Sequence, residues 1–142
     1  MDFRQITPDY AVAPQISPSD MADLAAAGFV TVINNRPDME NPPDLQSGAM
    51  RAAAEAAGMA YVDNPVVNGG LTLKMLEVQG NAIAAASGPV FAWCRTGTRS
   101  SMVWALSQAG KMPTGDIVAL LNKAGYDIPG LAAQIESLAA RG

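Results

Sequence analysis

The chain has 142 residues, 9 basic and 13 acidic side chains, one cysteine and no histidine. The missing histidine excludes Ser-His-Asp and Cys-His catalytic arrangements, histidine-ligated zinc and imidazole acid–base chemistry. A single cysteine also excludes an internal disulfide and a Cys-x-x-Cys metal or redox site. What remains is the chemistry of a lone thiolate or of carboxylates, or a binding role without catalysis.

The bulk composition predicts a single globular domain over residues 1–142. Apolar residues make up 49% of the chain and charged residues 15%, which is typical of a protein with a substantial core. The net charge of −4 and the lack of a basic stretch argue against nucleic-acid binding. No apolar run approaches the roughly 20 residues of a membrane span. Residues 1–4 lack the features of a signal peptide, so we expect a cytoplasmic protein.

Glycines and prolines divide the chain into alternating strands and helices. Short strands are expected at 3–6 and 10–13, and Ser17-Pro18-Ser19-Asp20 begins a helix that Gly28 ends. The pattern then predicts strands at 29–34, 59–62 and 89–93, and helices at 45–57, 72–87, 99–109, 114–124 and 131–140. This alternation predicts an α/β fold with a mostly parallel sheet of four to five strands, flanked by helices on both faces.

Three loops leave the carboxyl ends of the predicted core strands, at 35–44, 65–70 and 94–98. Ligands of open parallel sheets bind at this edge. The third loop begins with Cys94, at the point where a buried strand ends and a helix begins. Its backbone N–H groups from Arg95 to Ser100 can converge on one point, where the helix N-terminus adds about half a positive charge.

The side chains of this loop reinforce the positive potential around Cys94. Arg95 and Arg99 add two full charges, and Gly97 allows a sharp backbone turn. Each feature favours the thiolate over the thiol, and the same cradle would bind a tetrahedral anion. Ser100 and Ser101 are expected to cap the helix or to donate to the sulfur. Most lone cysteines are small buried hydrophobes, but a core cysteine does not need such a loop behind it.

The pattern Cys94-x-x-Gly97-x-Arg99-Ser100 resembles the active-site loop shared by cysteine-dependent phosphatases and rhodanese sulfurtransferases. The wider chain is similar to a bacterial family called phosphatase-like or sulfur transferase-like, the accessory domain of β-lactamase hydrolase-like proteins. The similarity lies in residues 32–40, in the Cys94 loop with its strand, and in residues 124–127. It implies a cysteine-phosphatase-like fold with Cys94 as nucleophile, Arg99 as the main anion contact, and a binding loop completed by Arg95, Thr96, Gly97, Thr98 and Ser100.

Two features of the loop favour sulfur chemistry over phosphate chemistry. Trp93 stands where the phosphatase signature has histidine, and four residues separate Cys94 from Arg99, where that signature has five. Rhodanese-type loops share the shorter spacing and enclose one persulfide sulfur, whereas phosphatase loops enclose three phosphate oxygens. Upstream, however, the chain lacks the Asp-x-Arg and Gly-His-Ile-Pro-Gly-Ala stretches of rhodaneses, and its strand–loop plan is closer to that of phosphatases.

A phosphatase also needs a general acid that protonates the leaving oxygen. The loop at 65–70, where dual-specificity phosphatases carry this aspartate, has no acid. Asp63 just upstream, and Asp38 and Glu40 on another strand-end loop, are the candidates, although Asp38 also fits an ordinary turn residue after Pro37. Arg36 is either an ion-pair partner of Glu40 or a second anion contact. Persulfide transfer needs no such acid, because sulfur leaving groups are good at neutral pH.

We therefore expect a sulfurtransferase. The Cys94 thiolate would accept a sulfane sulfur from a small anionic donor, such as thiosulfate, and pass it to an acceptor thiol or to sulfite, with Arg95 and Arg99 attracting the donor. One alternative is a phosphatase in which Cys94 attacks phosphorus and Asp38 or Asp63 is the acid. Another is a non-catalytic module that binds anions or thiols. None of these implies a metal or an organic cofactor.

Overall fold

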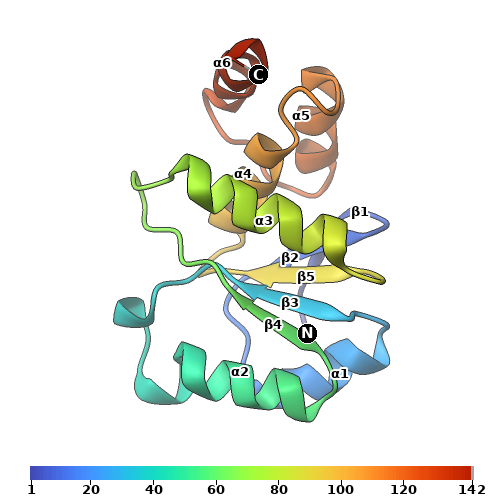
Figure 1. Cartoon of the computed structure of the whole chain (residues 1–142), viewed down its shortest axis with the longest axis vertical. Coiled ribbons are helices and arrows are strands. Elements are labelled where there is room, and N and C mark those ends of the chain that lie inside the picture. Colours follow the sequence, from blue (N-terminus) through green and yellow to red (C-terminus); the bar gives the residue numbers. More distant parts are fainter. Residues whose placement is uncertain (142) are drawn as a thin grey trace.

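A computed structural model describes residues 1–141 and contains a five-stranded sheet in the order β1-β2-β5-β3-β4 (Figure 1). The first two strands pair antiparallel, and β2, β5, β3 and β4 run parallel to one another. The strands are β1 (Arg4–Thr7), β2 (Tyr10–Ala13), β3 (Thr31–Asn34), β4 (Ala60–Asp63) and β5 (Val90–Trp93). The predicted α/β fold with a mostly parallel sheet is therefore confirmed.

Helices cover both faces of this sheet. In Figure 1, α1 and α2 lie on one face, α3 and α4 lie on the other, and α5 and α6 pack beyond α4. The helices are α1 (Met21–Ala26), α2 (Ser47–Ala56), α3 (Leu73–Ala85), α4 (Thr98–Ser107), α5 (Thr114–Lys123) and α6 (Leu131–Arg141). Three short 3₁₀ turns precede α1 and α2: η1 (Pro18–Asp20), η2 (Asp38–Glu40) and η3 (Pro43–Leu45). Among residues 1–141, no helix is long and apolar enough to cross a bilayer.

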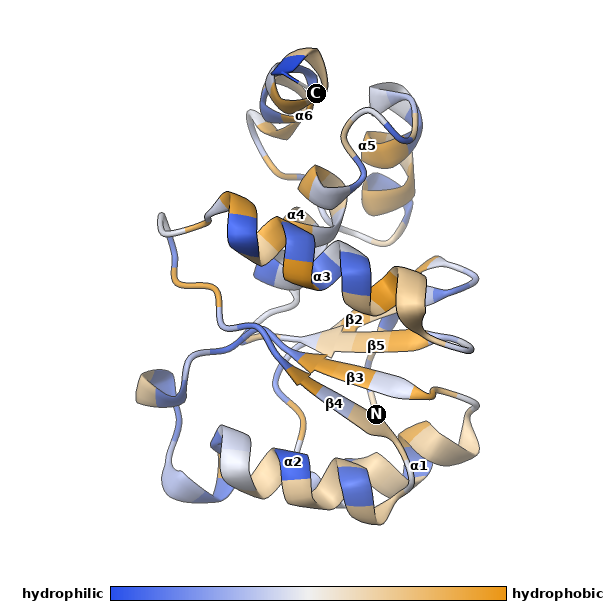
Figure 2. Cartoon of the chain, in the orientation of Figure 1, coloured by the Kyte–Doolittle hydropathy of each residue, from blue (hydrophilic) through white to orange (hydrophobic). Residues whose placement is uncertain are grey.

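Two hydrophobic cores share the central strand β5, whose residues are all buried. Because side chains alternate along a strand, Val90 and Ala92 face the core formed with α4, α5 and α6, whereas Phe91 and Trp93 face α1 and α2. Figure 2 shows largely hydrophobic central strands between helices that alternate hydrophobic and hydrophilic segments. Burial on both faces explains why β5 is a continuous apolar run rather than an alternating one.

The four parallel strands end at the same level. Ala13 and Asn34 both pair with Trp93, and Asn34 pairs with Asp63 on its other side, so the last residues of β2, β5, β3 and β4 form a row. The chain segments that follow these residues must therefore leave from one edge of the sheet. Three of those segments are the strand-end loops that the sequence pattern singles out.

Candidate functional site

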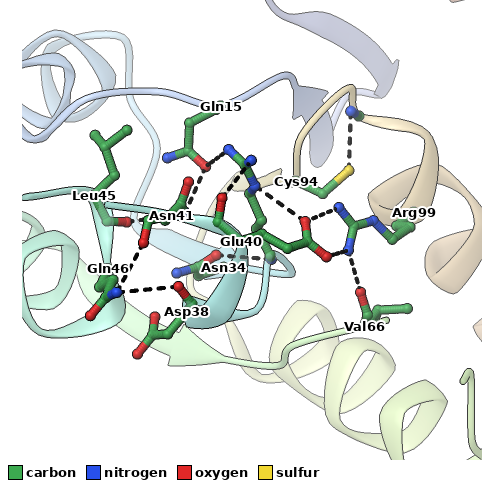
Figure 3. Close-up of polar contacts among 12 residues, drawn as sticks. Gln15, Asn34, Asp38, Glu40, Asn41, Leu45, Gln46, Val66, Cys94 and Arg99 are labelled. Carbon is green, nitrogen blue, oxygen red and sulfur yellow. Dashed lines mark hydrogen bonds and ion pairs between the residues drawn. The ribbon is translucent and has the colours of Figure 1, made fainter. Parts of the chain in front are cut away.

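Cys94 follows β5 directly and is fully buried. Its sulfur accepts a hydrogen bond from the backbone N–H of Gly97 at 3.1 Å (Figure 3). Gly97 has φ +91°, a left-handed conformation that favours glycine. The chain thus turns sharply around the sulfur before α4 begins at Thr98, one residue earlier than predicted.

The backbone of this loop, residues 94–100, presents free hydrogen-bond donors. Within the described chain, the N–H groups of Arg95, Thr96, Arg99 and Ser100 have no protein acceptor. The last two belong to the first turn of α4, where a helix has no internal partners for its N–H groups. Free N–H groups together with the positive end of the helix dipole are an arrangement that can hold an anion.

Arg99 extends from the first turn of α4 and is only 7% exposed. Its Nη1 donates to Glu40 Oε2 at 2.9 Å and to the Val66 carbonyl at 2.6 Å, and its Nη2 donates to Glu40 Oε1 at 2.7 Å. Over residues 1–141, no protein acceptor takes the Nε–H or the second Nη2–H, so one edge of the guanidinium remains free. Such an edge can clamp two oxygens of an anion.

The charge on Arg99 is stabilised from two sides. The hydrogen bond from Arg99 to Glu40 raises the pKa of the guanidinium, and a negative Cys94 sulfur beside it raises this pKa further. In Figure 3 the Cys94 sulfur and the Arg99 guanidinium face the same space. The nucleophile candidate and the anion contact predicted from the sequence are therefore brought together.

Glu40 is the residue that the sequence analysis missed as a partner of Arg99. Its carboxylate also accepts from Arg36 Nε at 3.3 Å, so it lies between two arginines. The hydrogen bond from Arg99 is the main cause that lowers the pKa of Glu40. Arg36 is predicted either to pair with Glu40 or to contact an anion. The structure shows the ion pair with Glu40. A spacing of 59 residues between Glu40 and Arg99 offers no local pattern that could have revealed their contact.

Asp38 and Asp63, the acid candidates other than Glu40, are also occupied by other contacts. Asp38 accepts hydrogen bonds from the backbone N and the Oγ of Ser47, both at 2.7 Å, and so caps the start of α2. Asp63 accepts from the Tyr61 hydroxyl at 3.0 Å at the end of β4. Among the described residues, Glu40 contributes the only carboxylate that hydrogen bonds the Cys94–Arg99 loop.

Asp38, Asp63 and Arg36 instead line a separate cavity of about 410 Å³. Its other walls are mostly apolar: Pro37, Met39, Pro65, Val67 and Met75. This cavity adjoins the Cys94 site through two connections, since Glu40 contacts Arg36 as well as Arg99, and the Val66 carbonyl accepts from Arg99.

The remaining loop residues have distinct positions. Arg95 is exposed, and within residues 1–141 its side chain makes no hydrogen bond. The hydroxyls of Thr96 and Thr98 bond each other at 3.0 Å. Ser101 Oγ donates to the Gly97 carbonyl at 2.8 Å, while Ser100 Oγ donates to Asn35 Oδ1 at 2.8 Å. Neither serine donates to the sulfur, and α4 has no side-chain cap hydrogen bond, so neither role expected of Ser100 and Ser101 is seen.

Tyr126, from the segment between α5 and α6, covers the outer side of the loop. Its hydroxyl donates to the Thr96 carbonyl at 3.2 Å and lies where a side chain on Gly97 would project. Partial burial raises the pKa of Tyr126, and the charge of Cys94 raises it further. In the described part of the chain, no three His, Cys, Asp or Glu side chains gather closely enough to share a metal ion.

Comparison with known sequences identifies relatives of this chain. The family described as "Beta-lactamase hydrolase-like protein, phosphatase-like domain" matches residues 2–111. A β-lactamase hydrolase-like protein of Xylella fastidiosa (strain Temecula1 / ATCC 700964) is 33% identical over 130 residues. That match covers 90% of this chain and 30% of the relative, so the chain spans about a third of the curated relative's length.

Solved structures show the same fold. A candidate phosphatase from Neisseria meningitidis superposes with a TM-score of 0.83 at 27% identity, covering 97% of this chain and 99% of that one. PTPMT1, solved in complex with PI(5)P, has a TM-score of 0.77 at 14% identity, covering 98% and 95% of the two chains. At that identity the likeness to PTPMT1 concerns the fold alone.

These matches confirm the cysteine-phosphatase-like fold expected from the Cys94 motif. They support the phosphatase alternative better than sulfur transfer, and rhodanese-like activity stays a prediction. The chain belongs to the phosphatase-like domain family of β-lactamase hydrolase-like proteins.

Proposed function

We propose that this domain hydrolyses phosphate monoesters through a covalent intermediate on Cys94. One observation carries the proposal: the Cys94 sulfur faces the free edge of Arg99 within a loop of unpaired backbone N–H groups. Family membership and the likeness to a candidate phosphatase support it. PTPMT1, whose fold this chain shares, is solved in complex with PI(5)P.

In the first step, the Cys94 thiolate attacks phosphorus and the bond to the leaving oxygen breaks, which leaves a phosphocysteine. Water then attacks phosphorus, releases inorganic phosphate and restores the thiolate. The Nε and Nη2 groups of Arg99 would hold two phosphoryl oxygens in both steps. The free N–H groups of the loop, at Arg95, Thr96, Arg99 and Ser100, would stabilise the charge on the third oxygen.

The surroundings of the loop predict which esters react best. Glu40 has a lowered pKa and is ionised at neutral pH, and hydrogen bonds engage Asp38 and Asp63 elsewhere. A leaving oxygen therefore receives little help from a general acid. We expect a strong preference for aryl phosphates, whose leaving groups depart without a proton, over alkyl phosphates. Asp38 and Asp63 stay acid candidates only for substrates that extend into the cavity they line.

Hydrolysis of p-nitrophenyl phosphate tests this function. Wild type should release nitrophenol, and Cys94→Ser should lose activity by on the order of 10³-fold or more. Arg99→Lys should also be strongly impaired, because a lysine cannot hold Glu40 and a phosphoryl group with the same planar fork. Acid-quenched wild type should carry one phosphoryl group by intact mass, and a Cys94→Ser variant as active as wild type would rule out the mechanism.

Sulfur transfer is the second candidate, favoured by the four-residue spacing between Cys94 and Arg99 and by the lack of a placed acid. The Cys94 thiolate would attack the outer sulfur of thiosulfate, the S–S bond would break, and sulfite would leave with the electron pair. An external thiol must then take the sulfur from the Cys94 persulfide, because the chain has no second cysteine.

Intact mass after incubation with thiosulfate separates the two candidates. An added sulfur atom on Cys94, together with no turnover of p-nitrophenyl phosphate, would favour sulfur transfer and contradict the phosphatase proposal. If neither adduct nor turnover is seen, and Cys94 alkylates no faster than a free thiol near pH 6, the domain is a binding module.

A further inference from the structure

A buried network of side-chain amides lies beneath the Cys94 loop. Its centre is Gln79, which lies on α3 and has no exposed surface. A polar side chain is costly to bury unless its hydrogen-bonding groups are satisfied. The hydrogen bonds of Gln79 must therefore offset the cost of burying it where α3 packs on the sheet.

Every hydrogen-bonding position of the Gln79 amide is used. Its Nε2 donates to the Tyr10 hydroxyl at 3.0 Å and to Asn35 Oδ1 at 3.1 Å. Its Oε1 accepts from Asn35 Nδ2 at 2.8 Å and from Asn64 Nδ2 at 2.9 Å. Rotating the amide by half a turn would place oxygen against oxygen at Asn35, so the orientation of Gln79 is fixed.

The network reaches the Cys94 loop through Ser100. The Tyr10 hydroxyl accepts from Gln79 and donates to the Ser100 carbonyl at 2.8 Å. Asn35 Oδ1 accepts from Gln79 and from Ser100 Oγ, also at 2.8 Å. Ser100 is the residue after Arg99 and belongs to the first turn of α4, so its position sets where the free N–H groups of that turn point.

A second route leads from the same network to the Arg99 side chain. The Asn35 carbonyl accepts from the backbone N of Val66 at 2.8 Å, and the Val66 carbonyl accepts from Arg99 Nη1 at 2.6 Å. The first residue of β2 and the segments that follow β3 and β4 are thereby tied to the loop after β5. One amide on α3 thus contacts a residue of β2 and the residues that follow β3 and β4.

We propose that Gln79 is a positioning residue that holds the Cys94 loop and Arg99 in register for reaction. Gln79 acts through Tyr10, Asn35 and Ser100 and touches no substrate. The turnover readout rests on the proposed function, but the position of the loop around the sulfur can be measured without turnover. Cys94 is the only cysteine, so alkylation by iodoacetamide reports on this site alone.

Two variants test the proposal. Gln79→Met keeps the approximate shape of the side chain and removes all four hydrogen bonds. Tyr10→Phe removes a single oxygen and preserves the ring that stacks on Trp104 at 5.9 Å. Ile135→Val is the control, because it trims the core at α6 without touching the network. All three are compared with wild type by kcat and KM for p-nitrophenyl phosphate, by thermal midpoint, and by alkylation.

We expect kcat to fall roughly 10- to 100-fold in Gln79→Met, and less in Tyr10→Phe, with KM changing much less. The alkylation rate near pH 6, divided by that near pH 9, should fall about threefold or more in both variants, since the N–H groups no longer converge on the thiolate. Ile135→Val should keep the wild-type ratio even if its thermal midpoint falls.

Three outcomes are decisive. A wild-type alkylation ratio in folded Gln79→Met would show that the network only stabilises the fold, and would overturn the proposal. If Gln79→Met does not fold, the ratio in Tyr10→Phe decides in the same way. If wild type hydrolyses no phosphate, the proposed function fails, yet a lowered ratio in the variants still supports positioning by Gln79.

Discussion

At the residue scale, the site depends on how one guanidinium is shared. Arg99 donates hydrogen bonds from Nη1 and Nη2 to Glu40 and from Nη1 to the Val66 carbonyl. Among residues 1–141, the edge formed by Nε and the second N–H of Nη2 stays free beside Cys94. Without Glu40 the buried cation would lack its partner, and it could rotate toward other acceptors. Glu40 itself is held by Arg36, so that two positive charges and one negative charge lie beside the proposed anion site.

Replacing Glu40 with glutamine tests this arrangement through pH. Because the folded pKa of Glu40 lies below its ordinary value of 4.5, Glu40 stabilises the fold fully above about pH 4.5, and this contribution is lost as pH falls further. Glu40→Gln lacks an ionisable group there. We expect the difference in urea-unfolding free energy between wild type and variant to be larger near pH 7 than near pH 3. An equal difference at both pH values would contradict the ion-pair account.

At the element scale, the important feature is the junction between β5 and α4. Gly97 allows the left-handed turn that directs its N–H to the Cys94 sulfur, and the Tyr126 hydroxyl occupies the place where a larger residue would extend. The short spacing between Cys94 and Arg99 is therefore combined with a cover from the segment between α5 and α6. That segment lies beyond residues 2–111, the part matched by the family.

Gly97→Ala should destabilise the protein by about 1–3 kcal/mol, because alanine is strained at positive φ and its Cβ collides with Tyr126. The matched control is Gly115→Ala in the first turn of α5, where nothing lies within 4 Å of an added Cβ. There alanine should stabilise by about 0.5–1 kcal/mol through helix propensity. Urea unfolding measures both changes. Equal effects of the two substitutions would show that the Gly97 turn is not under this constraint.

At the scale of the whole molecule, the two cores are joined by β5. Trp93 lies in the core with α1 and α2, whereas Trp104 lies in the core with α4, α5 and α6. Residues of α5 and α6, such as Ile117 and Ile135, are fully buried in the second core. The segment beyond the family match thus contributes buried side chains to the same hydrophobic core as β5.

This shared strand predicts that both cores unfold together. Trp93→Phe leaves Trp104 as the only tryptophan, and Trp104→Phe leaves Trp93, so each variant reports on one core by fluorescence. In each variant, the urea midpoint by fluorescence should coincide with the midpoint by far-UV circular dichroism. Midpoints that differ between fluorescence and dichroism in one variant would instead indicate that its core unfolds separately.

The sequence by itself determined the order of elements and the loop at Cys94. Turn residues, apolar runs and helix signals act over a few neighbours, so Gly28, Pro18 and the run at 90–93 predict boundaries within a few residues. The loop from Cys94 to Arg99 spans six positions, and its turn around the sulfur follows from one strand, one glycine and one helix N-terminus.

Only the tertiary structure decided what surrounds that loop. The pairing of Arg99 with Glu40, the Gln79 network and the cover by Tyr126 join residues far apart in sequence, which come together because four parallel strands end in one row. The same geometry assigned Asp38 to capping α2 and left the loop without a placed acid. Local pattern specifies which groups a segment offers, whereas the packing of strands and helices selects which of those groups meet.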